Sequence, residues 1–266
     1  MNEITTNPEY ENLLSLVQQL ETELADLVFD RDKLLYHVCP KLQTEYMLSI
    51  GKLEYAVFEY QCKILRAKRK IDIIQSYLNR EQPYDITEIE KQLDKEYHEY
   101  TEKLLEKQKE IESARFKNSN YGKPLTEEES TELKKLYTLI VKKLHPDINP
   151  NTTEEQHAQF IDAVNAYKNA NLSELRVIYL LLDKISVTET ENTMDKIVSR
   201  KEILLNEKEY MLNVIKNIKD TFPYNIKNLL QNENERKHKI DELSNQLTEC
   251  QEQYNNIEAR LKDMIK

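Results

Sequence analysis

The chain has 266 residues, of which 32% are charged, 39% are hydrophobic and only two are glycine, and its net charge is −10. This balance suits long solvent-exposed helices rather than one thick core, and the negative charge argues against general nucleic-acid binding. Three distant cysteines without a CxxC pair suggest neither a disulfide framework nor a zinc site, and the absence of any long apolar run predicts a cytoplasmic protein without membrane contact.

Residues 1–116 form a predicted N-terminal helical arm with coiled-coil character. A first apolar series in steps of three and four runs from Val17 to Val38, with Arg31 as its one break, and Pro40 predicts a turn or kink near Cys39. The longest series stops before Pro83 and consists of Ile50, Leu53, Val57, Tyr60, Ile64, Ala67, Ile71, Ile74 and Leu78. A looser third series follows, from Ile86 to Ile111.

Residues 117–125 lack apolar periodicity and gather Asn, Ser, Gly and Pro, which predicts a linker. A central unit is expected over residues 126–186, and residues 187–266 form a C-terminal coiled-coil arm divided at Pro223. The arms can pair as antiparallel neighbours or extend as kinked rods. We favour an intramolecular bundle of the two flanks, and a homodimer through one exposed seam is the alternative.

The central unit begins with a basic amphipathic segment, LKKLYTLIVKKLH, over residues 133–145. Its apolar positions share one stripe at helical spacing: Leu133, Leu136, Tyr137, Ile140, Val141 and Leu144. Four lysines and an outward strip of Thr138 and Leu139 occupy the remaining surface, and the window contains no acidic residue. This local reversal of charge favours an acidic partner surface.

His145-Pro146-Asp147 follows this helix directly and opens a short polar loop, expected to be exposed, that reaches Asn151. Thr152 with Glu155 predicts a capping box at the start of the next helix, whose apolar face includes Phe160. The pattern therefore predicts an antiparallel helical hairpin.

These residues resemble the J-domain family of Hsp70 co-chaperones over about 126–185, through LIVKKLHPD and FIDAVNAYKNA. The resemblance implies an all-α protein in which a J-domain-like hairpin is inserted between long coiled-coil or helical-bundle arms. It also implies contact with the nucleotide-binding domain of an Hsp70 and stimulation of its ATP hydrolysis. The implied contact residues are His145, Pro146, Asp147, Lys134, Lys135, Thr138, Leu139, Lys142 and Lys143.

The family's first helix has no good equivalent in the segment Tyr121–Leu125, so this helix is missing, displaced or supplied by a flanking helix. Ala170 stands where the family usually has a larger apolar residue. No region typical of client binding in the family follows the hairpin. The arms are therefore expected to bind an unknown client or assembly.

Other chemistry is not indicated. The remaining histidines are scattered without metal-ligand spacing, and the phosphate-binding and hydrolase motifs are absent, so we expect no metal, no cofactor and no enzymatic activity. A scaffolding coiled-coil protein with a degenerate hairpin is the alternative function. A regulatory module of a nucleic-acid assembly would require salt-dependent binding, which the charge balance does not favour.

Overall fold

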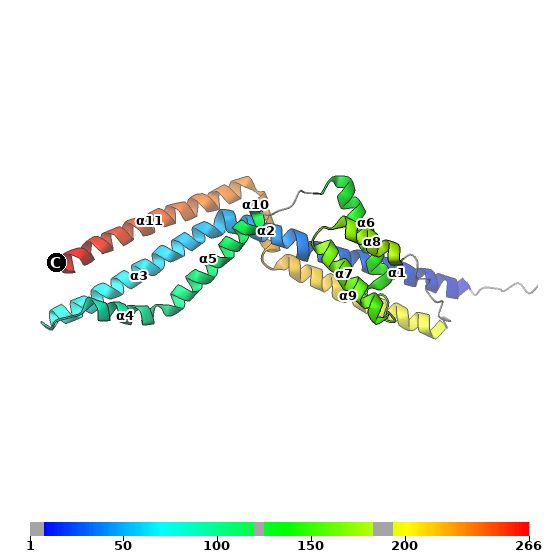
Figure 1. The fold of residues 1–266 in the computed structure, drawn as a ribbon, viewed down its shortest axis with the longest axis horizontal. Coiled ribbons are helices and arrows are strands. Elements are labelled where there is room, and N and C mark those ends of the chain that lie inside the picture. The colour runs from blue at the N-terminus through cyan, green and yellow to red at the C-terminus, as the bar shows by residue number, and fades with distance from the viewer. Residues whose placement is uncertain (1–7, 120–124, 183–193, 266) are drawn as a thin grey trace, which may run out of the picture. The chain divides into compact units, whose positions relative to one another are not determined.

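The computed structural model describes residues 8–119, 125–182 and 194–265. Within these ranges the chain forms helices joined by short turns and contains no strand (Figure 1). The predicted all-α class is confirmed. Residues 120–124 of the predicted linker and residues 183–186 of the predicted central unit lie outside the described ranges.

The helices follow one another in the order of their labels. The first part of the chain contains α1 (Pro8–Lys33), η1 (Leu34–Val38), α2 (Cys39–Tyr46), η2 (Met47–Gly51), α3 (Lys52–Asn79), α4 (Ile86–Glu96) and α5 (His98–Ser119). The remainder contains α6 (Glu127–Leu144), α7 (Glu154–Lys168), α8 (Leu172–Leu182), α9 (Met194–Asp220), η3 (Tyr224–Ile226), α10 (Lys227–Gln231) and α11 (Glu233–Ile265).

The chain divides into two compact units, and each unit combines segments that are distant in sequence. The described residues within 1–40 and 122–225 form the first unit, and those within 41–121 and 226–266 form the second. The central helices α6, α7 and α8 therefore share a unit with α1 and α9, which come from the two flanks.

In the first unit, α1 and α9 pack along each other and α1 also packs on α6 (Figure 1). Three contacts follow the same order along both helices, so α1 and α9 run parallel: Glu21 to Arg200, Glu23 to Lys208 and Arg31 to Met211. One apolar cluster joins these helices to α6, α7 and α8. Complete burial of a side chain such as Leu24 or Leu204 contributes about 1.5–3 kcal/mol each, so this cluster fixes the unit.

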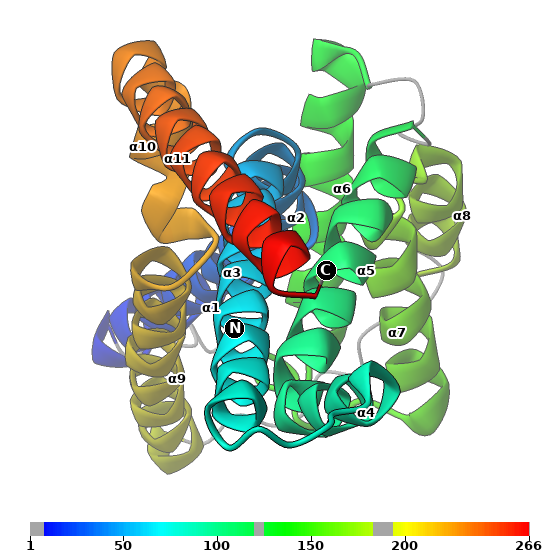
Figure 2. The ribbon, with the colours of Figure 1, turned by 90° about the vertical axis from the view of Figure 1, so that its left-hand side faces the viewer.

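Within the cluster, α8 lies beside α7 (Figure 2), and both pack on α6. The turn between α7 and α8 places Ala170 at a φ of 52°, in the left-handed region that favours glycine. The amide of Asn171 donates to the Ala166 carbonyl and closes the end of α7.

In the second unit, α3 packs along α11 and also contacts α4 and α5. The rings of Tyr60 and Tyr254 meet edge to face, with centroids 5.9 Å apart. Most of the predicted seam is buried on α3: Val57, Ile64, Ala67, Ile71 and Ile74. The heptad prediction for this helix is confirmed, although Leu78 at its end is exposed.

The predicted break at Pro40 is not a turn out of the helix. The backbone stays helical from Pro8 to Asn79, and the π-helical turn η1 immediately precedes Cys39. A proline ring collides with the carbonyl four residues before it, here that of Tyr36, which lies inside this wider turn. The π-helical turn therefore accommodates Pro40 and lets the helix continue.

Candidate functional site

The helix α6 presents its predicted apolar stripe to the core of the first unit. Thr126 caps its first turn together with Glu129, and the two residues exchange side-chain and backbone hydrogen bonds of 3.2 and 2.9 Å. Its buried residues are Leu133, Tyr137, Ile140, Val141 and Leu144. The predicted amphipathic helix is thus confirmed, with Leu136 half-buried at its margin.

The loop of residues 145–153 joins α6 to α7, and hydrogen bonds within it fix its conformation. The amides of Ile148 and Asn149 both donate to the His145 carbonyl, at 3.0 and 2.7 Å. The Asn149 side chain also donates to the Lys142 carbonyl, at 2.6 Å, and satisfies a carbonyl at the end of α6. The Ile148 side chain of this loop is buried in the core.

The cap of α7 lies one residue beyond the prediction. Thr153 and Gln156 form the capping box, rather than Thr152 and Glu155. The Thr152 amide instead donates to the Asn149 carbonyl, at 3.3 Å, so Thr152 still belongs to the turn. Two adjacent threonines offer the same capping chemistry, and the length of the turn selects the second.

His145 is buried, with 6% of its surface exposed, which corrects the expectation of a fully exposed loop. Its ring meets that of Phe160 edge to face, with centroids 5.2 Å apart. Burial lowers the pKa of His145, and the carboxylate of Asp147 partly opposes this shift. Its Nδ1 accepts a hydrogen bond from the Asp147 amide at 3.2 Å, so the neutral ring carries its proton on Nε2.

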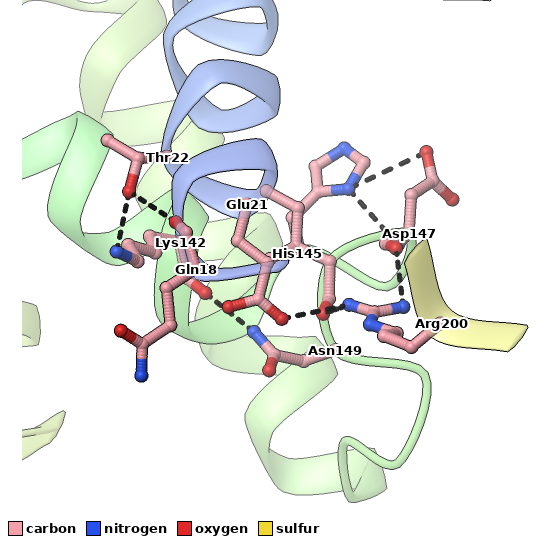
Figure 3. A network of polar contacts seen from close by, with 9 residues as sticks. Gln18, Glu21, Thr22, Lys142, His145, Asp147, Asn149 and Arg200 are labelled. Atoms are coloured by element: carbon pink, nitrogen blue, oxygen red, sulfur yellow. Dashed lines mark hydrogen bonds and ion pairs between the residues drawn. The ribbon is translucent and has the colours of Figure 1, made fainter. Parts of the chain in front are cut away.

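The next two residues reach the surface. Pro146 is exposed, and 41% of the Asp147 side chain is accessible. One carboxylate oxygen of Asp147 lies 3.6 Å from Nδ1 of His145 (Figure 3). The loop therefore holds a buried imidazole below an accessible carboxylate.

Three of the four lysines on α6 contact neighbouring helices. The ammonium of Lys134 lies 5.1 Å from the ring centre of Phe29 in α1, and that of Lys143 lies 5.4 Å from the ring centre of Tyr179 in α8. Lys142 donates to the Thr22 hydroxyl of α1 at 2.7 Å (Figure 3). Lys135 is exposed.

The strip expected to face outward, Thr138 and Leu139, is only half-exposed. Thr138 lies one helical turn from both Lys134 and Lys142, on the face along which α1 packs. Its hydroxyl is buried and has no hydrogen-bond partner in the described part of the chain. The strip is therefore partly covered, and residues 133–145 alone contain no sign of the helices that pack on α6.

Two polar contacts of this site were missed from the sequence. Arg200 of α9 donates to the carbonyls of Asp147, at 3.4 Å, and Ile148, and it also pairs with Glu21 of α1 at 3.4 Å (Figure 3). Nothing in the local pattern around Arg200 indicates this contact, since 53 residues separate it from Asp147.

The second missed contact is a carboxylate in the core. Asp32 is almost fully buried and accepts a hydrogen bond of 2.5 Å from the Tyr137 hydroxyl. Arg31 pairs with the other oxygen of Asp32 at 2.7 Å. Burial and the Asp32 carboxylate raise the pKa of Tyr137 above its usual range, so the phenol stays a donor. The sequence carried one sign of this buried polar contact, because Arg31 interrupts the apolar series from Val17 to Val38.

The structure also bears on metal and membrane sites. Across residues 8–119, 125–182 and 194–265, no three His, Cys, Asp or Glu side chains gather as a metal-binding group. Over the same ranges, no helix combines the length and the apolar character that crossing a membrane requires.

The similarity of this chain to known proteins was tested in three ways. No protein-family model matches it, and no curated protein or solved structure matches it either.

Proposed function

We propose that this chain is a non-enzymatic co-chaperone that contacts a cytoplasmic Hsp70 through the 145–153 loop and α6 and stimulates its ATP hydrolysis. One observation carries the proposal: hydrogen bonds fix the loop, and it still offers the Asp147 carboxylate to a partner. A fixed, accessible carboxylate is a strong acceptor for a charge-assisted hydrogen bond from an arginine. Pro146 beside it is exposed and limits the freedom of the loop.

The lysines of α6 supply the second part of the proposed surface. Lys135 and Lys143 are exposed, and the whole chain carries a net charge of −10. A local basic face on an acidic protein orients an acidic partner and raises the rate of encounter. The lysines thus contribute speed and orientation, and the loop contributes the specific contact.

The position of α1 supports a J-domain-like arrangement in which a flanking helix supplies the missing first helix. Phe29 of α1 packs against the rings of Tyr137 and Tyr167, with centroids 6.5 and 5.7 Å apart. Those two tyrosines stack on each other across α6 and α7, with centroids 4.1 Å apart. An aromatic residue from α1 therefore completes the core beneath the hairpin.

In this proposal the second unit binds the client or assembly, and a homodimer through an exposed helical seam is the alternative. Its helices carry mixed charges and ion pairs, such as those of Arg66 with Glu90 and Asp94. A pull-down that compares wild type with His145→Gln separates partners of the arms from Hsp70, because the arm partners should survive the substitution.

The test is the ATPase rate of the host Hsp70 under single-turnover conditions with purified protein. Wild type should stimulate it, and Asp147→Asn and His145→Gln should each abolish the stimulation. Asp162→Asn and His157→Gln are matched controls, because both residues are exposed on α7 outside the loop. Failure of the wild-type chain to stimulate its host Hsp70 at any concentration would overturn the proposal.

A scaffolding role is the second candidate function. It is favoured because other parts of the first unit cover some of the residues proposed to contact Hsp70. His145 is buried, and α1 and Arg200 occupy part of the surface that an Hsp70 would need. A scaffold predicts that Asp147→Asn changes neither the ATPase rate nor any partner. The two candidates therefore give opposite results in the same assay.

A further inference from the structure

Arg200 contacts the loop from outside the central helices. Its guanidinium donates to the main-chain carbonyls of Asp147 and Ile148, and only 19% of its side chain is exposed. The Glu21 carboxylate of α1 pairs with it on the other side, and this carboxylate is itself 25% exposed. An arginine held between two loop carbonyls and a carboxylate is a formed contact rather than a free surface side chain.

The helix that carries Arg200 is attached mainly to α1. α9 packs along α1 through Ile197, Leu204 and Met211. These residues belong to the same buried cluster as Leu24 and Phe29 of α1, whereas the hydrogen bonds of α9 to the loop come from the Arg200 side chain. The Arg200 side chain can therefore leave the loop while the apolar residues of α9 stay packed in the core.

The position of Arg200 conflicts with a partner at the same loop. Its positive charge contacts the main chain of the residue whose carboxylate is proposed to receive a partner arginine, Asp147. The carboxylate itself is accessible, but a second cation approaching it meets the like charge of the nearby guanidinium. We propose that Arg200 is a built-in competitor of Hsp70, which restrains the loop from α9 and must leave it before Hsp70 engages.

This inference rests on the proposed function and adds a means of regulating it. If only a fraction of the molecules has Arg200 released, the apparent affinity for Hsp70 equals the intrinsic affinity multiplied by that fraction. One charge-assisted contact of this kind shifts such an equilibrium by a factor of about 5 to 30.

The test is the concentration at which the chain half-maximally stimulates the Hsp70 ATPase. Arg200→Ala should lower this concentration about 5- to 30-fold, and Arg200→Lys should have a smaller effect, because an ammonium cannot bridge two carbonyls in the same way. Lys208→Ala is the matched control, since Lys208 lies on α9, pairs with Glu23 of α1 at 2.6 Å and does not contact the loop. This control should behave as wild type.

A second measurement does not depend on Hsp70. The amides of Ile148 and Asn149 donate within the loop, and their hydrogen exchange should be faster in Arg200→Ala than in wild type or Lys208→Ala. Thermal melting checks that each variant is folded. If Arg200→Ala melts early, Glu21→Gln replaces it, because this change weakens the restraint without altering α9.

The outcomes separate the inference from the proposed function. If wild type stimulates Hsp70 and Arg200→Ala does so at the same concentration, the competitor role is overturned and the co-chaperone role stands. The competitor role is also overturned if Lys208→Ala gains as much as Arg200→Ala, because the effect then belongs to the whole helix pair. If no variant stimulates Hsp70, the proposed function is wrong and the inference falls with it.

Discussion

The buried pair of Tyr137 and Asp32 gives the most direct test of how the central helices are held to α1. In Tyr137→Phe the aromatic ring and its stack on Tyr167 remain, and only the hydroxyl is lost. The carboxylate of Asp32 keeps its contact with Arg31 but loses a hydrogen bond of 2.5 Å in the core. A hydrogen bond to a charged group contributes about 1.5–3 kcal/mol, so we expect a loss of about 2 kcal/mol.

Urea denaturation followed by circular dichroism measures this loss, and the melting temperature should fall by roughly 4 to 8 °C. Tyr167→Phe is the matched control, because its hydroxyl forms no hydrogen bond within the described residues, and it should change stability by less than about 0.5 kcal/mol. A double-mutant cycle with Asp32→Asn should give a coupling energy of about 1–2 kcal/mol. A loss in Tyr137→Phe as small as that in Tyr167→Phe would refute the assigned role of this contact.

Two further changes probe the turn after α7 and the buried imidazole. Ala170→Gly should stabilise the first unit by about 1 kcal/mol, seen as a higher denaturation midpoint, because glycine adopts a φ of 52° without strain; an unchanged midpoint would contradict this. Burial lowers the pKa of His145, assisted by Arg31 and opposed by Asp147, so the folded state binds this proton less readily than the unfolded chain. Stability should therefore be complete above the unfolded pKa of 6.5 and fall as the pH drops below it. His145→Gln should reduce this slope in pH-dependent melting without removing it, because burial also lowers the pKa of His37; an identical slope would argue against a neutral His145.

The sequence predicted elements whose cause lies within a few turns of the chain. The seam of α3 is an example, since apolar residues at steps of three and four need one buried face whatever covers it. The turn after Leu144 also follows from nearby residues, because Pro146 and Pro150 cannot continue a helix. Pro40 predicted a turn or kink, and the chain does not turn out of the helix there because η1 departs from the regular α-helical hydrogen bonding that a proline would break.

The contacts of α6 and its loop with α1 and α9 could not be predicted from the sequence of α6 and its loop. Thr138 lies outward on a wheel drawn for α6 alone, but its hydroxyl is buried on the face along which α1 packs, and α1 lies more than a hundred residues earlier. A carboxylate such as that of Asp32 is expected at the surface, and only its hydrogen bond with the Tyr137 hydroxyl explains why it is buried. The HPD residues were found because they are adjacent in sequence, whereas Arg200 is adjacent to them only in space.

Because α1 pairs with α9, the first unit can complete its fold only late in the synthesis of the chain. Glu21 and Arg200 are 179 residues apart, and Glu23 and Lys208 are 185 apart. Contacts between such distant positions form late, since the long intervening chain must first be closed into a loop. During synthesis α6, α7 and α8 emerge from the ribosome before α9. A newly made chain therefore passes through a stage in which the 145–153 loop exists without its contact with Arg200.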